Sequence, residues 1–421
     1  MLNEAATTAE YRDIELRLVT DRRPGFNRLK RLYTDLGGGG RRWSETRCRH
    51  LASKVRTLTI TGILKKYRGR PGYPFVLRII QDAALIELTS LHLETSPGSL
   101  QAFGLQQQNE LGRALERFPK LTHLKMENIA LPLGNLIELI IRPEMESIVA
   151  KLVTSYHDDP LITAHTSRHA NCQHSRRQEP LPHLDLAQCS LTYHQIAGLL
   201  TIANGVKKLR ISIPRQGLAA RTDYRCVPFC PLATVHNCHV SLDPRGAGIS
   251  LASGHGSIEE LDMVVIGYEV WKSAVLGVAP FDHFTGLHHH NGTGMDFSLF
   301  SKLRKIRIPA ECFFSPHQMK RSISAMLPRP LEELEIIFRT DAHRISIDNH
   351  PHWPECYYGW LEDIINAKTV NYPALKVVKA EEWVDHSASR IVPLEVPLGL
   401  LSNAQLNNVQ ISFQGRSRAL D

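Results

Sequence analysis

The residues of this chain with the most evident chemistry are histidines and a cysteine that could bind zinc. His165, His169, Cys172 and His174 stand close together, and imidazole nitrogen and thiolate sulfur are ligands that zinc prefers. The surrounding stretch is polar and has no apolar residues that would fix the ligands in space. We therefore expect neither a metal site nor any other cofactor.

Three further groups also favour loops over sites. Gly37 to Gly40 are followed by two arginines but lack the Gly-Lys-Ser/Thr ending of a phosphate loop. His288 to His290 lie in a Gly-rich stretch, and Cys226 and Cys230 are flanked by prolines. None of these groups has the apolar frame that a binding site needs.

Sequence motifs of catalysis are also absent. The chain contains no Gly-x-Ser-x-Gly elbow, no Gly-x-Gly-x-x-Gly after a strand and no His-Glu-x-x-His. A triad assembled from distant residues stays open, because many Ser, Cys and His are present. We expect a protein that is not an enzyme, with no catalytic residues.

A recurring leucine pattern is the strongest structural signal. Its best copy is LPHLDLAQC, with Leu181, Leu184, Leu186 and Cys189 at the spacing of a leucine-rich repeat. A single unit of this kind cannot bury its apolar side, so neighbouring copies must stack into one continuous core. Such an array provides a binding surface rather than a reaction centre.

Copies of this pattern occur along the whole chain, with gaps of 33, 33, 25 and 28 residues among them. Ile148 divides the wide gap between Leu124 and Leu184, and Val235 divides the gap between Leu209 and Leu261. The residues in the middle leucine position are Leu58, Leu91, Leu124, Leu184, Leu209, Leu261, Ile306, Leu334, Val378 and Val409.

Helical stripes separate the copies. Residues 191–203 place apolar side chains on one helical face before Gly205, and residues 100–118 and 319–327 are similar and end at prolines. Alternating strands and helices predict an α/β fold, an irregular leucine-rich-repeat solenoid with a curved parallel sheet inside and helices outside.

The domain organisation follows from charge and composition. Residues 1–70 carry 17 Lys and Arg against 7 Asp and Glu, whereas the rest carries 33 against 35. We expect a basic helical N-terminal cap over residues 1–50, either solvated or in contact with nucleic acid or an acidic partner. Residues 51–421 would form the solenoid, with insertion loops near 155–180, 214–230, 244–256, 282–296 and 339–358.

The inner face of the sheet can be predicted, because side chains alternate along a strand. Its charges change sign from one strand to the next. Acidic strands would repel phosphate, so this face suits a protein target and not a nucleic acid, or it is an ordinary solvated surface. The predicted partner-binding residues are His123, Lys125, Asp185, Lys208, Arg210, Glu260, Asp262, Lys305, Arg307, Glu333 and Glu335.

Four segments resemble the fungal F-box and leucine-rich-repeat proteins. YRDIELRL at 11–18 resembles the end of the F-box and its linker, and HLASKVRTLTITG at 50–62 resembles the first repeat. FSKLRKIRIPAECFF at 300–314 and LPRPLEELEIIF at 327–338 resemble later repeats. The resemblance implies a substrate receptor for a cullin-type ubiquitin ligase, which binds its targets through the repeats and insertion loops.

The F-box itself would lie before Tyr11, and ten residues precede it. We therefore expect it to be absent or truncated, so that contact with the ligase adaptor requires an F-box upstream. The alternative is a stand-alone leucine-rich-repeat scaffold without ligase recruitment, associated with RNA through its basic N-terminus.

The remaining features concern compartment and core. No stretch has the length and apolarity of a membrane helix or a secretory signal, and eight unpaired cysteines favour reduced, partly buried thiols. We expect a cytoplasmic or nuclear protein without a membrane partner. Trp353, Tyr357, Tyr358 and Trp360 could be interface anchors, but Trp360 and Leu361 favour the start of a buried helix.

Overall fold

The computed structural model describes the segments that form the regular structure of the chain. These are residues 11–18, 23–37, 45–63, 66–67, 70–71, 73–83, 85–95, 105–129, 131–151, 153–154, 179–187, 189, 191, 193–212, 244–264, 294–314, 322–338, 358–383, 390–393 and 396–417.

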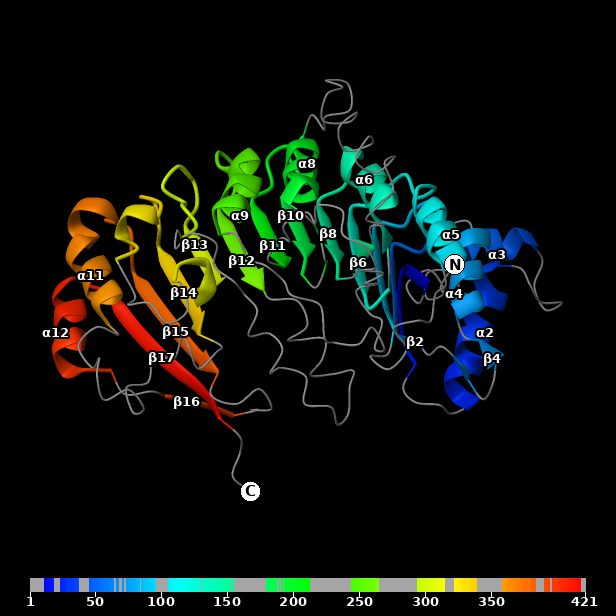
Figure 1. Ribbon diagram of the computed structural model, residues 1–421. Helices are drawn as coiled ribbons and strands as arrows, with labels where there is room; N and C mark the ends of the chain where they lie inside the picture. Colours follow the sequence, from blue (N-terminus) through cyan, green and yellow to red (C-terminus); the bar gives the residue numbers. More distant parts are fainter. Residues whose placement is uncertain are drawn as a thin grey trace, which may run out of the picture.

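One curved sheet of thirteen strands runs through all of these segments (Figure 1). Its strands follow one another in chain order and are parallel, except that β16 lies at the end of the sheet, antiparallel to β17. The strands, in spatial order, are β1 (Asp13–Arg17), β2 (Thr57–Ile63), β5 (Ser90–Thr95), β6 (His123–Glu127), β8 (Ser147–Ala150), β10 (His183–Leu186), β11 (Lys208–Ser212), β12 (Glu260–Val264), β13 (Lys305–Pro309), β14 (Glu333–Phe338), β15 (Val377–Trp383), β17 (Gln410–Ser417) and β16 (Arg390–Pro393).

Helices cover the outer, convex side of this sheet (Figure 1). They are α2 (Arg23–Gly37), α3 (Glu45–Ala52), α4 (Tyr73–Asp82), α5 (Leu105–Leu115), α6 (Leu133–Ile141), α8 (Tyr193–Ala203), α9 (Pro244–Leu251), α11 (Gly359–Asn371) and α12 (Leu398–Leu406), with the 3-10 turns η4 (Ala252–Gly254), η6 (Ala310–Cys312) and η7 (Ser324–Met326). Two small pairs, β3 (Lys66–Tyr67) with β4 (Arg70–Pro71) and β7 (Leu131–Pro132) with β9 (Val153–Thr154), lie beside the main sheet. Parallel strands with helices on one side confirm the predicted α/β fold with a curved parallel sheet.

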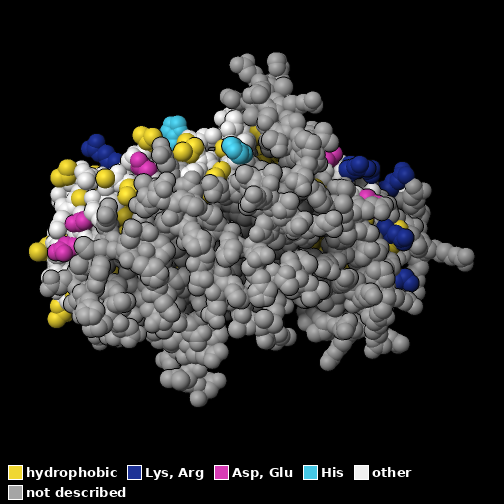
Figure 2. All heavy atoms as spheres, in the orientation of Figure 1, with side chains coloured by type: hydrophobic (Ala, Val, Ile, Leu, Met, Phe, Trp, Pro, Cys, Tyr) yellow, Lys and Arg dark blue, Asp and Glu magenta, His cyan; other side chains and the backbone are white. Residues whose placement is uncertain are grey.

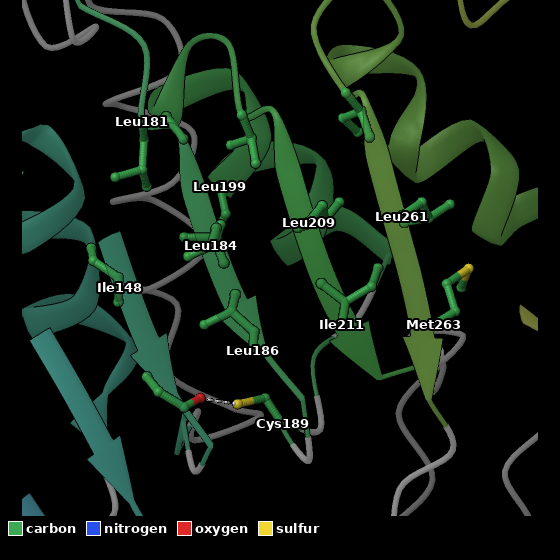
Figure 3. Packing of buried hydrophobic residues seen from close by; sticks show 14 of the residues in the cluster. Ile148, Leu181, Leu184, Leu186, Cys189, Leu199, Leu209, Ile211, Leu261 and Met263 are labelled. Atoms are coloured by element: carbon green, nitrogen blue, oxygen red, sulfur yellow. Dashed lines mark hydrogen bonds between the residues drawn. The ribbon is translucent and has the colours of Figure 1, made fainter. Parts of the chain in front are cut away.

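The leucine pattern sets the register of the strands. Leu184 of β10 pairs with Ile148 on one side and Leu209 on the other, and Leu209 pairs with Leu261 (Figure 3). Each of these side chains is at most 2 % exposed, within one apolar core that extends from the first strand to the last. Aliphatic residues at equal positions therefore stack between the sheet and the helices.

The pairing of the strands corrects the predicted leucine positions at both ends of the sheet. Val378 pairs with Ile411 rather than with Val409, so the last copy was placed two residues early. Valine and isoleucine are both β-branched apolar residues, so the sequence alone did not distinguish Val409 from Ile411. At the other end Ile14 pairs with Leu58 and adds a copy that the sequence analysis missed.

The predicted segment boundaries need three corrections. The N-terminal cap is not purely helical, because β1 joins the sheet beside β2, although α2 and α3 are helices as expected. The predicted insertion at 244–256 contains α9, whose Ala247 and Leu251 are buried, so it supplies an outer helix rather than a loop. The predicted helix over 319–327 is only the short turn η7 within the described part of that range.

Three predictions for the intervening segments are confirmed. The helices expected in 191–203 and 100–118 are α8 and α5. Trp360 and Leu361 begin the helix α11 and are fully buried. The described cysteines Cys48, Cys189 and Cys312 are buried, and the thiol of Cys189 donates a hydrogen bond to the Ala150 carbonyl oxygen at 3.0 Å (Figure 3).

Several predicted groups fall outside the described residues. They are the histidines and cysteine at 165–174, Gly38 to Gly40, Cys226, Cys230, Val235, His288 to His290, Trp353 and Tyr357, together with all or nearly all of the insertions near 155–180, 214–230, 282–296 and 339–358. Among the helices that are described, none combines the length and apolarity needed to cross a membrane.

Side-chain hydrogen bonds link equal positions of adjacent repeats. The hydroxyl of Thr89 donates to the Arg56 carbonyl oxygen at 3.1 Å, and that of Thr122 donates to the Thr89 carbonyl oxygen at the same distance. Both bonds span 33 residues, as does the bond from the Thr95 hydroxyl to the Asn128 carbonyl oxygen. The first repeats thus share one length and one set of contacts.

Gly62 lies where the pairing of β2 with β5 is irregular, and its replacement by alanine should destabilise the protein. Its φ is +70°, and an added Cβ would lie 2.7 Å from the Leu18 carbonyl oxygen. Left-handed backbone disfavours a side chain, and the backbone carbonyl cannot turn away. We expect Gly62→Ala to lower the free energy of unfolding by about 1–2 kcal/mol. Urea unfolding measures this loss, with Gly134→Ala as control because open space surrounds Gly134.

Candidate functional site

Charged side chains form two rows across five neighbouring strands, from β10 to β14, on the face opposite the buried leucines. The first row consists of the residues that open each strand, which are His183, Lys208, Glu260, Lys305 and Glu333. The second row consists of the third residue of each strand, which are Asp185, Arg210, Asp262, Arg307 and Glu335. Side chains two positions apart share one face of a strand, and neighbouring strands lie about 4.8 Å apart, so each row is a line of adjacent charges.

The second row is a continuous chain of ion pairs. Arg210 lies 2.8 Å from Asp262 through Nε and 3.6 Å from Asp185 through Nη1. Arg307 lies 3.2 Å from the other Asp262 oxygen, Oδ1, and 2.6 Å from Glu335. Each cation thus contacts carboxylates on both neighbouring strands. The alternating signs that the sequence predicted neutralise one another within the protein.

Arg307 of the second row contacts three carboxylates. Its side chain is 27 % exposed, and it also approaches Glu381 of β15 at 3.7 Å. Burial by itself would lower the pKa of its guanidinium, but the charges of Asp262 and Glu335 outweigh burial and raise that pKa. Arg307 therefore neutralises carboxylates from three other strands.

The first row is paired less completely and is more exposed. Lys208 lies 3.1 Å from Glu260, and Lys305 lies 3.7 Å from Glu333. The side chains of Lys208 and Lys305 are 59 % and 54 % exposed, about twice as much as the arginines of the second row. Exposed pairs of this kind contribute little to stability, so these charges can be exchanged for those of a partner at small cost.

Glu333 is the most strongly paired member of the first row. Its carboxylate accepts a hydrogen bond from the Lys379 ammonium and lies near Lys305. The bond from Lys379 lowers the pKa of Glu333 below its ordinary value of 4.5, and the same bond raises the pKa of Lys379.

This shift predicts how stability depends on pH. A lowered pKa in the folded protein means that the ionised carboxylate stabilises the fold above pH 4.5, and that this contribution disappears as the pH falls through the folded-state pKa. We expect Glu333→Gln to lower the free energy of unfolding by about 0.5–1 kcal/mol at pH 7. The difference from the wild type should be smaller at pH 3 than at pH 7, which urea unfolding at the two pH values would measure. An equal loss of stability at both pH values would contradict the lowered pKa of Glu333.

A shallow groove lies over the two rows. It has a volume of about 340 Å³ and is lined by eight of the predicted partner-binding residues together with His183 and three leucine-position residues. Small-molecule pockets of similar size are mostly apolar with few polar groups. A groove lined by this many charges is better suited to the charged surface of a macromolecule. The eight predicted residues are Lys208, Arg210, Glu260, Asp262, Lys305, Arg307, Glu333 and Glu335.

The other three predicted residues do not line the groove. Asp185 contacts Arg210 from the neighbouring strand, and its side chain is only 9 % exposed. His123 and Lys125 belong to β6, which β8 separates from β10, and they face Glu146 and Glu127 at 3.6 and 3.2 Å. The sequence listed one continuous surface, but the structure divides it at β8, where Ser147 and Val149 carry no charge.

The predicted partner-binding residues leave out His183, which lines the groove, and also Lys379 and Glu381. The last two lie on β15 and contact the rows through Glu333 and Arg307. Their positions beside Val378 were readable from the same alternation that identified the other residues.

The fold and the face define a curved α/β protein with a parallel sheet and a surface of paired opposite charges. No family model matches the chain, and no curated protein is significantly similar to it.

Proposed function

We propose that this chain is a non-catalytic protein-interaction module of the leucine-rich-repeat type. The single observation that carries the proposal is the uninterrupted row structure of its inner face, where side chains of five parallel strands form one surface. In repeat proteins of this construction the inner sheet face is the extended binding surface.

The repeat geometry supports the leucine-rich-repeat assignment. Aliphatic residues stack in register from β1 to β17, and threonine hydroxyls repeat the same bond every 33 residues in the first repeats. A length of 33 residues is sufficient for one strand and one helix. The helices on the outer side complete the expected unit.

The charge pattern supports a protein partner. The second row has three carboxylates against two arginines, and the first row alternates in sign, so the face has no uniform positive field that would attract a polyanion. A protein whose surface alternates in the opposite order would replace the pairs of the first row with its own.

The biological role that we propose is an F-box-like substrate receptor for a cullin-type ubiquitin ligase. It rests on the resemblance of residues 11–18, 50–62, 300–314 and 327–338 to fungal F-box and leucine-rich-repeat proteins. The second candidate is a scaffold without ligase recruitment.

A binding test separates the two roles. The chain, expressed together with any in-frame segment encoded upstream of Met1, would be mixed with the purified adaptor of a cullin-type ligase, and complex formation measured by size-exclusion chromatography. A stable complex supports the receptor, while its absence at micromolar concentrations favours the scaffold.

The interaction face itself is tested by charge reversal. The double variant Lys208→Glu/Lys305→Glu reverses two exposed cations of the first row. In affinity purification with quantitative mass spectrometry, the amount of each co-purified protein that depends on this face should fall at least about 10-fold. Arg113→Glu/Arg117→Glu is the matched control, because Arg113 and Arg117 are exposed on and just after α5, on the outer side. If both double variants retain the same partners, the inner face is not the binding surface.

RNA binding is favoured by one observation at the other end of the molecule. Lys and Arg side chains gather over the N-terminal helices (Figure 2). The helices α2 and α3 carry the exposed Arg28, Lys30, Arg31 and Arg49. If they bind RNA, a filter-binding assay should retain single-stranded RNA on the full chain, with an affinity that falls steeply with salt. Retention that is unchanged by Arg28→Glu/Arg31→Glu would exclude these helices as the site.

A further inference from the structure

A second group of ionisable residues lies on the inner face, away from the two rows. It consists of His92 and Glu94 of β5 and Glu127 of β6. His92 and Glu94 are two positions apart and share one face of their strand, and Glu94 pairs in register with Glu127. One ligand atom from each residue lies within 4.8 Å of the other two. The parallel register thus brings together three side chains that the sequence keeps up to 35 positions apart.

The imidazole of His92 has an unsatisfied nitrogen in this group. Its Nε2 is buried and has no hydrogen-bond partner in the structure, and the nearest carboxylate oxygen, Oε2 of Glu94, lies 3.9 Å away. Buried polar atoms are nearly always bonded, and an ion or a water is the usual reason for an exception. Among the described residues, Glu94 has no Lys or Arg as an ion-pair partner either.

Like charges face each other across the two strands. Glu94 and Glu127 are directly opposed, an arrangement that destabilises a sheet unless a cation lies between them. Lys125 and Lys151 approach Glu127 at 3.2 and 2.8 Å, but both contact its Oε1. Among the described ion pairs, none involves the second oxygen of Glu127, so this oxygen can still coordinate an ion.

From this geometry we propose that His92, Glu94 and Glu127 form a binding site for a borderline divalent cation of the zinc class. One imidazole nitrogen and two carboxylate oxygens are a donor set that zinc accepts, with water as the fourth ligand, whereas calcium and magnesium select oxygen alone. Bonds of about 2.0–2.2 Å require the donors to move closer together by about 1 Å. Rotation of the two flexible glutamate side chains can provide that movement.

The test uses Co²⁺ as a spectroscopic probe for zinc on the full chain. Four-coordinate Co²⁺ gives intense visible absorption bands, and the expected result is one equivalent that Zn²⁺ displaces. His92→Gln and Glu94→Gln should each weaken this equivalent by at least about 10-fold, since even the loss of a residue that only orients a ligand costs roughly 10–100-fold. Glu260→Gln, the same change on the same face outside the group, should leave it unaltered.

A variant that should bind the metal ion more tightly completes the test. Lys125→Gln removes a cation that competes for Glu127, so the Zn²⁺ that displaces the Co²⁺ should bind more tightly. Thermal unfolding monitored by circular dichroism checks that each variant is folded. The absence of visible bands in the wild type, or bands of equal strength in His92→Gln and Glu94→Gln, would overturn the proposal, and so would weaker binding by Lys125→Gln.

Discussion

Trp360→Ala should give the largest loss of stability of any change proposed for this protein, about 3–5 kcal/mol in the free energy of unfolding. The indole is fully buried at the start of α11. Its ring lies 5.9 Å from that of Phe314 and 6.1 Å from that of Phe338, measured between centroids. Alanine would leave a cavity between the helix and β14 that these rigid rings cannot fill.

Circular dichroism during urea unfolding would measure this effect. Val370→Ala on the same helix is the control, because Val370 is 75 % exposed and its truncation should change stability by no more than about 0.5 kcal/mol. Trp360→Phe should cost clearly less than Trp360→Ala, since it keeps a ring and removes an indole N–H that has no hydrogen-bond partner. Equal losses for Trp360→Ala and Val370→Ala would show that α11 is not packed as described.

Arg307→Met should give the second largest loss, about 2–3 kcal/mol. Methionine retains the apolar stem but removes the cation that Asp262, Glu335 and Glu381 share. Removing one partner of a buried ion pair costs roughly 3–5 kcal/mol because the remaining charges lose their compensation, and the partial exposure of Arg307 reduces that value. The same measurement of unfolding in urea applies.

Arg304→Met is the matched control for Arg307→Met. Arg304 also contacts two carboxylates, Glu259 at 2.7 Å and Glu332 at 3.7 Å, but its side chain is 53 % exposed. Solvent screens such pairs, so we expect a much smaller loss of stability than for Arg307→Met. Adding Glu335→Gln to Arg307→Met should recover part of the loss by removing an uncompensated charge. If the two single variants lose equal stability, the second row does not hold the strands together.

The sequence predicted the fold from local pattern. Leu184, Leu209 and Leu261 recur at a spacing that only a stacked array can bury, and the structure aligns them in one register. The inner face was equally readable, because alternation along a strand requires Lys208 and Arg210 to lie on the side opposite the leucines. The first inference depends on a short motif that recurs along the chain, and the second depends on the two-residue period of a strand. Both can be read without knowledge of the tertiary contacts.

The ends of the array were harder to predict. Ile14 and Leu16 alternate with charged residues in a short stretch, and they pack against the core because β1 pairs with β2. The segment that contains α9 has small residues and glycine, which are typical of loops, but packing of Ala247 and Leu251 against α8 makes it a helix. Tertiary packing outweighs weak local preferences in both segments.

The sequence by itself determined that this protein repeats a strand and an outer helix and that charges of alternating sign cover its inner face. Only the tertiary structure decided which of those charges pair with one another and which stay exposed. It also decided that His92, Glu94 and Glu127 meet on adjacent strands. The physical reason is that local periodicity fixes which side of a strand a residue faces. The distances between residues of different strands depend on register and burial, which arise only when the strands pack together.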